Sequence, residues 1–390
     1  MTPTVVGVSR RHQVSRRADV PNAPGALDGL LIADFGRVLA GPYATMLLAD
    51  LGADVVKIER PTGGDDTRSW GPPFTDDGEA TYFLSVNRNK RSEFWDLRDD
   101  DDLAAARDLV TRADVVVENF LPGTMDRLGL GYDDVVALNP DIVYVSITGF
   151  GDSALPGCDL LVQAVGGLMS VTGTPEAPTK VGVAMVDVVT GLHAAVGMLA
   201  ALRHRDATGE GQRVEVSLLS SLLSALVNQS GAHVMTGAVP RGMGNRHPSL
   251  APYEIFATAG RPLAIAVGNN TQFAALSATL EHPEWASDPR FATNAARVEH
   301  RDELFALLER ALAGADAETW AARLADARVP AGPVNDLAQA FDLADEVGLP
   351  MRVDVDGLAQ VANPIRMSAT PATYRSRPPR MRPGPGGREQ

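Results

Sequence analysis

Residues 30–59, LLIADFGRVLAGPYATMLLADLGADVVKIE, have the pattern of two strands joined by a helix. LLIADF is an apolar run of strand length, and ADVVKIE at 53–59 is a second one. Pro42 suits the first turn of the helix between them, because its missing N–H is harmless there. Gly52 suits the end of that helix. The stretch therefore predicts a βαβ unit of the parallel, doubly wound α/β type.

The same alternation continues along the chain. It predicts a helix at 102–113, strands at 114–120 and 141–150, and a strand followed by a long helix at 209–226. Two further strands are expected within 253–270, and 271–328 are mostly helical. We expect an α/β fold with a Rossmann-like large domain, built from both ends of the chain, and a smaller second domain.

The composition changes along the chain and suggests where the domains begin and end. Residues 228–250 are rich in Gly, Pro and polar residues, and a loop of that length is usually a functional lid or a linker. The two ends of the chain lack apolar periodicity, and a transit peptide is the alternative to disorder for the first segment. We expect a disordered extension (1–26), a large domain (27–227), a small domain with a glycine-rich loop (228–320), a return to the large domain (321–374) and a disordered tail (375–390).

Charge and cysteine content exclude several classes of protein. A formal charge of −14 argues against a nucleic-acid groove, which needs a basic face. Cys158 is the only cysteine, so neither an intramolecular disulfide nor a cysteine-based zinc site is expected, and no metal site is predicted. The apolar stretch 181–202 contains Asp187 and His193, which favours a buried helix over a membrane span. Because no secretory signal follows Met1, we expect a cytoplasmic protein without a membrane partner.

Polar and glycine residues follow several of the predicted strands. Ligands of parallel sheets gather at the carboxyl ends of the strands. The glycines of a dinucleotide fingerprint are absent after the first strand, so a nicotinamide site has weak support. Arg60 and Arg68 suggest phosphate binding, since guanidinium groups match phosphate oxygens, although both could simply be solvated loop residues. The residues at this edge are 37–42, 59–68, 119–123 and 149–152.

Several blocks of the sequence resemble the class III (CaiB/BaiF-like) CoA-transferases. The blocks include VLAGPYATMLLADLGADVVKIERPTGGDDTRSWGPP (38–73), DVVVENFLPGTMDRLGLGYD (114–133) and VGVAMVDVVTGLHAAVGMLAAL (181–202). They follow the order of the family from residue 27 to about 365. The resemblance implies that acyl-CoA and a carboxylic acid are the substrates and that no cofactor is bound permanently. It also implies an obligate homodimer of two ring-like chains threaded through each other.

The resemblance also implies roles for individual residues. The catalytic aspartate of the family corresponds to Asp187, at the end of a strand before a helix, and the glycine-rich loop over it corresponds to RGMGN, with Gly242 and Gly244. The positions that match CoA-contacting residues of the family, together with their neighbours Leu39 and Arg68, are Arg37, Val38, Leu39, Ala40, Arg60, Arg68, Arg98, Asn119, Phe120 and Arg127.

CoA transfer without ATP exchanges a thioester for an acyl anhydride. Asp187 suits this chemistry because its carboxylate can form that anhydride. A carboxylate with an ordinary pKa is ionised at pH 7 and attacks without a general base. Backbone N–H groups of nearby glycines would stabilise the tetrahedral oxyanions. The alternative for Asp187 is a helix N-cap, a position that favours Asp, and the two roles are compatible.

Two positions depart from the pattern of related enzymes. Acyl-CoA racemases have a histidine where this chain has Cys158, so an acyl-CoA isomerase is a weaker alternative to a CoA-transferase. A second alternative is a catalytically silent CoA-binding protein. Leu39 stands where formyl-CoA:oxalate transferases carry glutamine, which argues against formate and oxalate. Dicarboxylates are the first acids to consider. His193 is interpreted as a core histidine.

Overall fold

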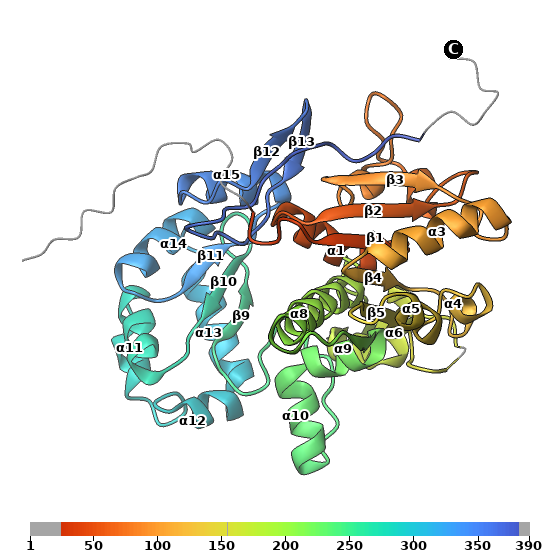
Figure 1. The fold of residues 1–390 in the computed structure, drawn as a ribbon. Coiled ribbons are helices and arrows are strands. Elements are labelled where there is room, and N and C mark those ends of the chain that lie inside the picture. Colours follow the sequence, from red (N-terminus) through yellow and green to blue (C-terminus); the bar gives the residue numbers. More distant parts are fainter. Residues whose placement is uncertain (1–24, 154, 382–390) are drawn as a thin grey trace, which may run out of the picture.

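The computed structural model describes residues 25–153 and 155–381, which form two lobes (Figure 1). The larger lobe is built on a six-stranded parallel sheet in the order β3-β2-β1-β4-β5-β8. The strand order changes direction between β1 and β4, the point at which parallel α/β sheets bind ligands. The strands are β1 (Leu31–Asp34), β2 (Asp54–Glu59), β3 (Lys90–Phe94), β4 (Val115–Glu118), β5 (Val143–Thr148) and β8 (Gln212–Ser217).

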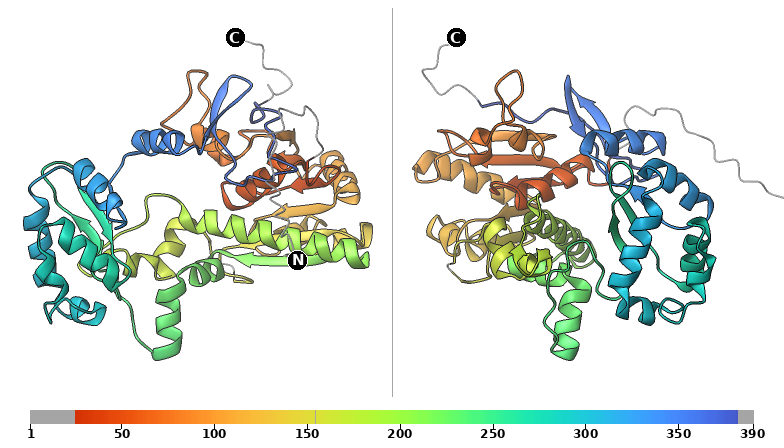
Figure 2. Two further views of the ribbon diagram at one scale, coloured as in Figure 1. Left: turned by 90° about the vertical axis from the view of Figure 1, so that its left-hand side faces the viewer. Right: turned by 180° about the vertical axis from the view of Figure 1, so that it is seen from behind.

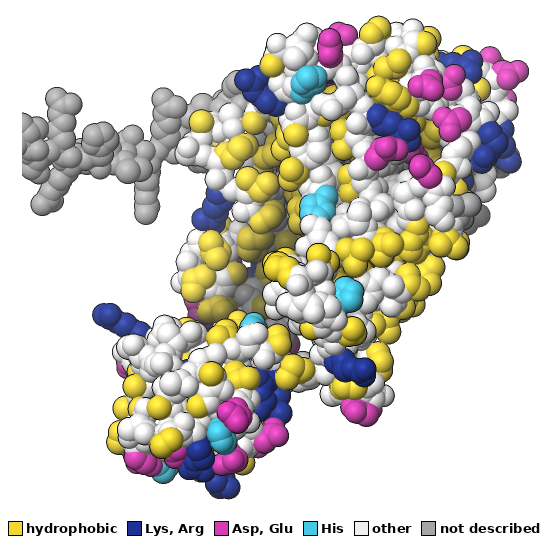
Figure 3. Space-filling view, turned by 90° about the horizontal axis from the view of Figure 1, so that it is seen from below, with side chains coloured by type: hydrophobic (Ala, Val, Ile, Leu, Met, Phe, Trp, Pro, Cys, Tyr) yellow, Lys and Arg dark blue, Asp and Glu magenta, His cyan; other side chains and the backbone are white. Residues whose placement is uncertain are grey.

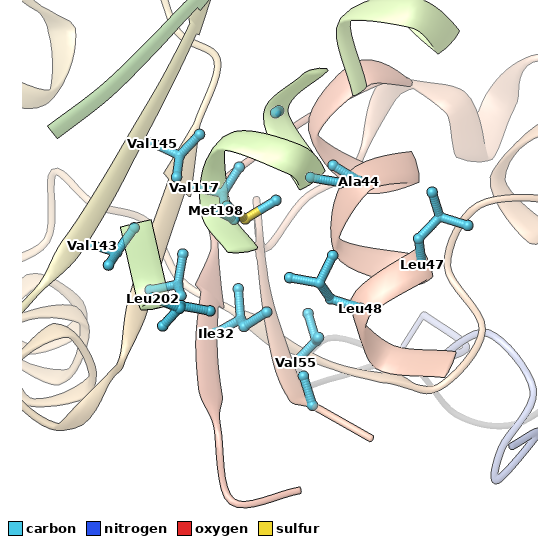
Figure 4. Close-up of a cluster of buried hydrophobic side chains, with 14 of the residues drawn as sticks. Ile32, Ala44, Leu47, Leu48, Val55, Val117, Val143, Val145, Met198 and Leu202 are labelled. Atoms are coloured by element: carbon cyan, nitrogen blue, oxygen red, sulfur yellow. The ribbon is translucent and has the colours of Figure 1, made fainter. Parts of the chain in front are cut away.

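Helices cover both faces of this sheet because strand residues alternate between them. On one face, α1 (Ala40–Asp50) and α8 (Met185–Thr208) pack on Ile32, Val117 and Val145 (Figure 4). On the other face, α3 (Asp100–Arg112), α4 (Thr124–Arg127) and α5 (Tyr132–Leu138) pack on alternate residues such as Ala33 and Val116. The predicted strand and helix pattern of 30–59 is confirmed.

One long apolar helix and several shorter elements complete the larger lobe. Helix α8 alone among the described helices is long and apolar enough to span a membrane, and its Ala194 and Met198 side chains are buried in the core of the lobe. The other elements are η1 (Asp66–Ser69), α2 (Thr81–Leu84), α6 (Asp159–Val165), α7 (Leu168–Val171), β6 (Gly173–Thr174), β7 (Ala177–Pro178), α9 (Leu218–Ala225) and α10 (Val227–Thr236).

The smaller lobe has its own core around a three-stranded antiparallel sheet, in the order β11-β10-β9. Its apolar cluster includes Trp320 and Leu324 of α14 and continues to Val329, past the boundary that we expected at residue 320. The amphipathic pattern of α14 accounts for this, since that helix buries its apolar face against the small sheet. The elements are β9 (Tyr253–Phe256), β10 (Leu263–Ala266), α11 (Asn270–Thr279), η2 (Pro283–Ala286), α12 (Asn294–Glu299), α13 (Arg301–Leu312), α14 (Ala317–Asp326) and β11 (Ala331–Pro333).

The C-terminal segment returns to the larger lobe through α15 (Leu337–Glu346) and the hairpin of β12 (Arg352–Val355) and β13 (Leu358–Val361) (Figure 2). Residues 375–381 differ from the disorder expected there. Arg375 donates hydrogen bonds to the carbonyls of Ala49, in the last turn of α1, and of Gly52 and Ala53, just after that helix. The expected extension 1–26, apart from residues 25 and 26, and the rest of the tail lie outside the described residues.

Candidate active site

The loop after β1 is held in one conformation by hydrogen bonds from two other loops. The Arg37 amide donates to Asn119 Oδ1 and the Arg37 carbonyl accepts from Asn119 Nδ2, both at 2.8 Å. Val38 has φ +64°, a left-handed conformation that is costly for a β-branched residue. Its amide donates to the carboxylate of Asp65 at 3.2 Å, which stabilises that conformation.

A large cavity opens at this loop and contains Asp187. Its volume is about 750 Å³. Six residues predicted from the sequence line it together with Asp187, and with Asp187 they represent three separate segments of the chain. These are Arg37, Val38, Leu39, Ala40, Asn119 and Phe120.

A second, basic cavity of about 520 Å³ lies beside the first and shares Arg37 and Phe120 with it. The Arg37 guanidinium stacks on the Phe120 ring at 4.6 Å, between the two cavities. Arg60, Arg98 and Arg127 line the basic cavity as well. Four of the five arginines predicted from the sequence therefore lie around one space.

The four arginines differ in their neighbours. Arg60 pairs with Asp66, and Arg98 pairs with Asp96 at 2.9 Å. Arg127 donates to the Thr124 hydroxyl at 3.0 Å. This partner is neutral, so the bond does not compensate the charge of Arg127. Burial and the nearby Arg60 lower the pKa of Arg37, and guanidinium groups remain charged at neutral pH in any case.

Arg68 lines neither of these cavities, although Glu59, to which it is bonded, lines the basic one. It donates to both carboxylate oxygens of Glu59, at 2.6 and 2.7 Å, and stacks on Phe83 at 3.7 Å. A further bond reaches the carbonyl of Pro379. The structure therefore uses Arg68 to fix the end of β2 and the C-terminal segment, and does not place it with the other arginines.

Asp187 is the third residue of α8 and not, as expected, the last residue of a strand. A loop precedes the helix, since the short run before Asp187 forms no ladder with the parallel sheet. The Ala184 N-cap supplies no side-chain hydrogen bond. Instead, Oδ1 of Asp159 accepts from the amides of Val186, at 2.8 Å, and Asp187, at 3.3 Å.

Burial and the neighbouring Asp159 raise the pKa of Asp187 to about 7. This differs from the ordinary carboxylate, ionised at pH 7, that we expected from the sequence. Desolvation disfavours the charged form, and a second acid nearby disfavours it further. Near neutral pH the Asp187 side chain is therefore divided between its protonated and ionised forms.

Sequence reasoning did not identify Asp159 or Tyr82 as site residues, although both line the cavity with Asp187. Burial, Asp187 and Asp159 raise the pKa of Tyr82 to about 12, so its hydroxyl keeps its proton. Asp159 directly follows Cys158, which also lines the cavity, so the GCDL motif was a usable signal. Tyr82 carries no such signal, because only the fold brings α2 to this cavity.

The glycine-rich loop is not among the residues that line the cavity with Asp187. The Gly242 amide donates to the Ser170 carbonyl at 2.8 Å, and the Gly244 amide donates to the Gly173 carbonyl at 2.6 Å. Both N–H groups are occupied in this conformation. Within the described part of the chain, no group of three or more His, Cys, Asp or Glu residues is arranged to hold a metal ion.

The similarity to known proteins extends over most of the chain. It is 40% identical over 378 residues to a succinate–glutarate CoA-transferase of Agrobacterium fabrum, covering 93% of this chain and 94% of that protein. It is 39% identical to an acetyl-CoA:oxalate CoA-transferase of Acetobacter aceti, covering 88% and 90%. A crystal structure of a CaiB/BaiF family protein from Brucella suis matches with a TM-score of 0.83 and 41% identity, covering 92% and 97%.

These similarities identify the class of protein as a CoA-transferase enzyme, as the sequence motifs predicted. The model of CoA-transferase family III matches residues 27–382, and the chain belongs to that family.

Proposed function

We propose that the enzyme moves coenzyme A from an acyl-CoA donor to a carboxylic acid acceptor, with Asp187 as the nucleophile. The observation that carries this proposal is the junction of two cavities at Arg37 and Phe120: one holds the Asp187 carboxylate and the other is lined by arginines. CoA has a phosphorylated nucleotide at one end and a thiol at the other. The basic cavity would hold the phosphates, and the thioester would extend past Phe120 toward Asp187.

In the first step, an ionised Asp187 oxygen attacks the carbonyl carbon of the thioester. The new C–O bond forms an acyl-aspartyl anhydride, and the C–S bond breaks to release CoA thiolate. The thiolate then attacks the Asp187 carbonyl carbon, which forms an aspartyl-CoA thioester and releases the donor acid. The acceptor carboxylate attacks the carbonyl carbon of this thioester, which forms a second acyl-aspartyl anhydride and releases CoA thiolate. The thiolate then attacks the acyl carbon of the acceptor, which forms the new acyl-CoA and releases the Asp187 carboxylate.

The negative charge that develops in each tetrahedral intermediate needs a hydrogen-bond donor. The protonated Tyr82 hydroxyl is one donor in the same cavity. The Gly242 and Gly244 amides are further candidates, but the loop must first release the carbonyls of Ser170 and Gly173. Closure of that loop would also exclude water, which hydrolyses anhydrides.

We propose dicarboxylic acids as the first substrates to test, because relatives at about 40% identity are named for succinate, glutarate and mesaconate. A homodimer with a Rossmann-like large domain also belongs to this proposal. Apolar side chains are exposed along α8 to α10, including Val196, Val227 and Met235, and Figure 3 shows hydrophobic side chains gathered on that side of the molecule. An exposed apolar surface of this kind favours association with another chain. Light scattering of the purified enzyme measures the mass in solution.

Mass spectrometry after incubation with a panel of acyl-CoAs tests the chemistry. We expect a hydroxylamine-sensitive adduct on the peptide that contains Asp187, and none in the Asp187→Asn variant. The donor that forms the adduct identifies the acyl group. Absence of an adduct together with absence of CoA exchange would contradict the proposal, and exchange of the α-proton with deuterated water would indicate an isomerase instead.

A further inference from the structure

The first turn of α8 depends on a carboxylate that lies 28 positions away along the chain. Helix N-termini leave their first amides without helical partners, and a side chain near the N-cap usually satisfies them. The Ala184 N-cap of α8 has no side chain that could do so. Oδ1 of Asp159, the first residue of α6, bonds the amides of Val186 and Asp187 instead.

The second oxygen of Asp159 is fixed by a fully buried glutamine. Asp159 Oδ2 accepts from Gln163 Nε2 at 2.7 Å, and Gln163 Oε1 accepts from the Val181 amide at 2.9 Å. Asp159 and Gln163, which we call the Asp159–Gln163 bracket, therefore hold the chain on both sides of the loop before α8. The bracket therefore fixes the backbone from which the Asp187 side chain extends.

The bracket also places a negative charge beside the nucleophile. The other titratable or charged side chains that line the same cavity are Arg37 from the loop after β1, Asp66 from η1, Tyr82 from α2, and Cys158 before α6. Burial is the main cause of the raised pKa of Asp187. Among the charged side chains of this cavity, Asp159 is the one that raises it further. The α8 amides that would favour an ionised Asp187 are already bonded to Asp159.

We propose that Asp159 is a positioning residue for CoA transfer, whose carboxylate fixes the first turn of α8 and whose charge makes Asp187 a more basic nucleophile and a poorer leaving group. This inference rests on the proposed function. A more basic carboxylate attacks the thioester more readily in its ionised form. The anhydride that it forms is less reactive, because Asp187 leaves from it less readily, so the anhydride lies closer in energy to the thioester and loses less acyl group to water.

The variants Asp159→Asn and Gln163→Ala separate charge from geometry. Asp159→Asn keeps an oxygen for the Val186 and Asp187 amides and removes the charge. Gln163→Ala breaks the bracket and keeps the charge of Asp159. The combination Asp159→Asn with Gln163→Glu restores an acceptor for both the new amide and the Val181 amide, in case Asp159→Asn alone folds poorly.

The pH dependence of adduct formation on Asp187 is the first measurement. With Asp159→Asn we expect the acid limb to move to lower pH by about one unit, the size of shift that one neighbouring charge commonly causes. With the combined variant the limb should move less, because a carboxylate at residue 163 still lies near the site. We also expect a larger share of the adduct to be lost to water. With Gln163→Ala the rate should fall without a shift of the limb. A slower Asp159→Asn variant whose limb stays in place would show a purely structural role and overturn the inference.

A second measurement does not require turnover. The infrared carboxyl band of Asp187, isolated by difference against Asp187→Asn, follows its titration directly. A lower midpoint in Asp159→Asn supports the inference, and an unchanged midpoint contradicts it. If the wild-type enzyme forms no adduct, the proposed function fails, while this titration still decides the role of Asp159.

Discussion

The Nζ atom of Lys57 lies 2.9 Å from Oδ2 of Asp65, and neither side chain is exposed to solvent. Lys57 also donates to the Gly36 carbonyl at 2.7 Å, and Asp65 accepts from the Val38 amide. Burial opposes ionisation of Asp65, but the Lys57 ammonium overcomes that effect and holds the pKa of Asp65 below its usual value. This ion pair therefore supports the strained loop at the junction of the two cavities.

Asp65→Asn should lower the free energy of unfolding by about 3–5 kcal/mol, because it removes the carboxylate that contacts the buried Lys57 ammonium directly. It should also raise KM for acyl-CoA, since Val38 loses the carboxylate that holds its backbone. Denaturant unfolding and steady-state kinetics measure the two effects. Asp54→Asn is the matched control, because its pair with Arg91 is half exposed and worth at most about 1 kcal/mol. Equal KM values for the two variants would contradict the role given to Asp65.

Arg127→Ala should raise KM for acyl-CoA about tenfold with little change in kcat, the effect of losing roughly 1.4 kcal/mol of uniform substrate binding. Arg127 contributes an uncompensated charge to the basic cavity. The KM of the wild-type enzyme should rise with salt, and that of the variant should rise less. Arg112→Ala removes an exposed arginine that is paired with Asp108 outside the cavities, and should leave KM unchanged. A similar KM increase in both variants would argue against a phosphate site.

The sequence predicted the parts of the fold that depend on local pattern. Apolar runs such as 30–35 and 53–59 form parallel strands because both faces of the sheet are covered, and Arg37 and Asn119 meet because both follow neighbouring strands. Arg68 was harder to assign. Its partner Glu59 is also at a strand end, but only the fold shows that the carboxylate uses both guanidinium donors.

The environment of Asp187 could not be predicted because it is made by distant residues. Asp159 bonds amides in the first turn of α8 from 28 positions away along the chain. The sequence around Ala184 does not indicate that this helix lacks a local N-cap side chain. Likewise, Arg375 lies in a Pro-rich segment without periodicity. It is held by the carbonyls of Ala49, Gly52 and Ala53, which come together only when α1 and the turn after it have formed.

Gly191→Ala should lower the free energy of unfolding by about 1–3 kcal/mol, because the added methyl group overfills the contact between α1 and α8. Its Cβ would lie 2.7 Å from the Ala40 carbonyl oxygen. Since Ala40 lines the Asp187 cavity, KM for acyl-CoA should rise as well.

Gly231→Ala is the matched control within a helix. Its Cβ would meet only the end of the Met235 side chain, at 3.3 Å, so the substitution should stabilise α10 by up to about 1 kcal/mol. Thermal unfolding of the two variants at one protein concentration compares them. The close contact between the helices is unimportant if Gly191→Ala is as stable as wild type.

Asp187→Asn should stabilise the protein, and more so at pH 8 than at pH 5. The pKa of Asp187 is about 7 in the folded chain, against an ordinary value of 3.8 that applies when the chain is unfolded. Between these values the folded state binds more protons than the unfolded state, so the contribution of Asp187 to stability falls as the pH rises from about 4 to about 7. At about 1.4 kcal/mol per pKa unit, the loss in the wild-type protein amounts to at most about 4 kcal/mol. The asparagine cannot ionise and avoids this loss. Urea unfolding of both proteins at several pH values gives the difference in their free energies of unfolding, in which the titration of groups that do not interact with Asp187 cancels. A difference that does not change between pH 5 and pH 8 would show that Asp187 ionises in the folded protein as easily as in water, and would remove the electrostatic role of burial and Asp159 at this site.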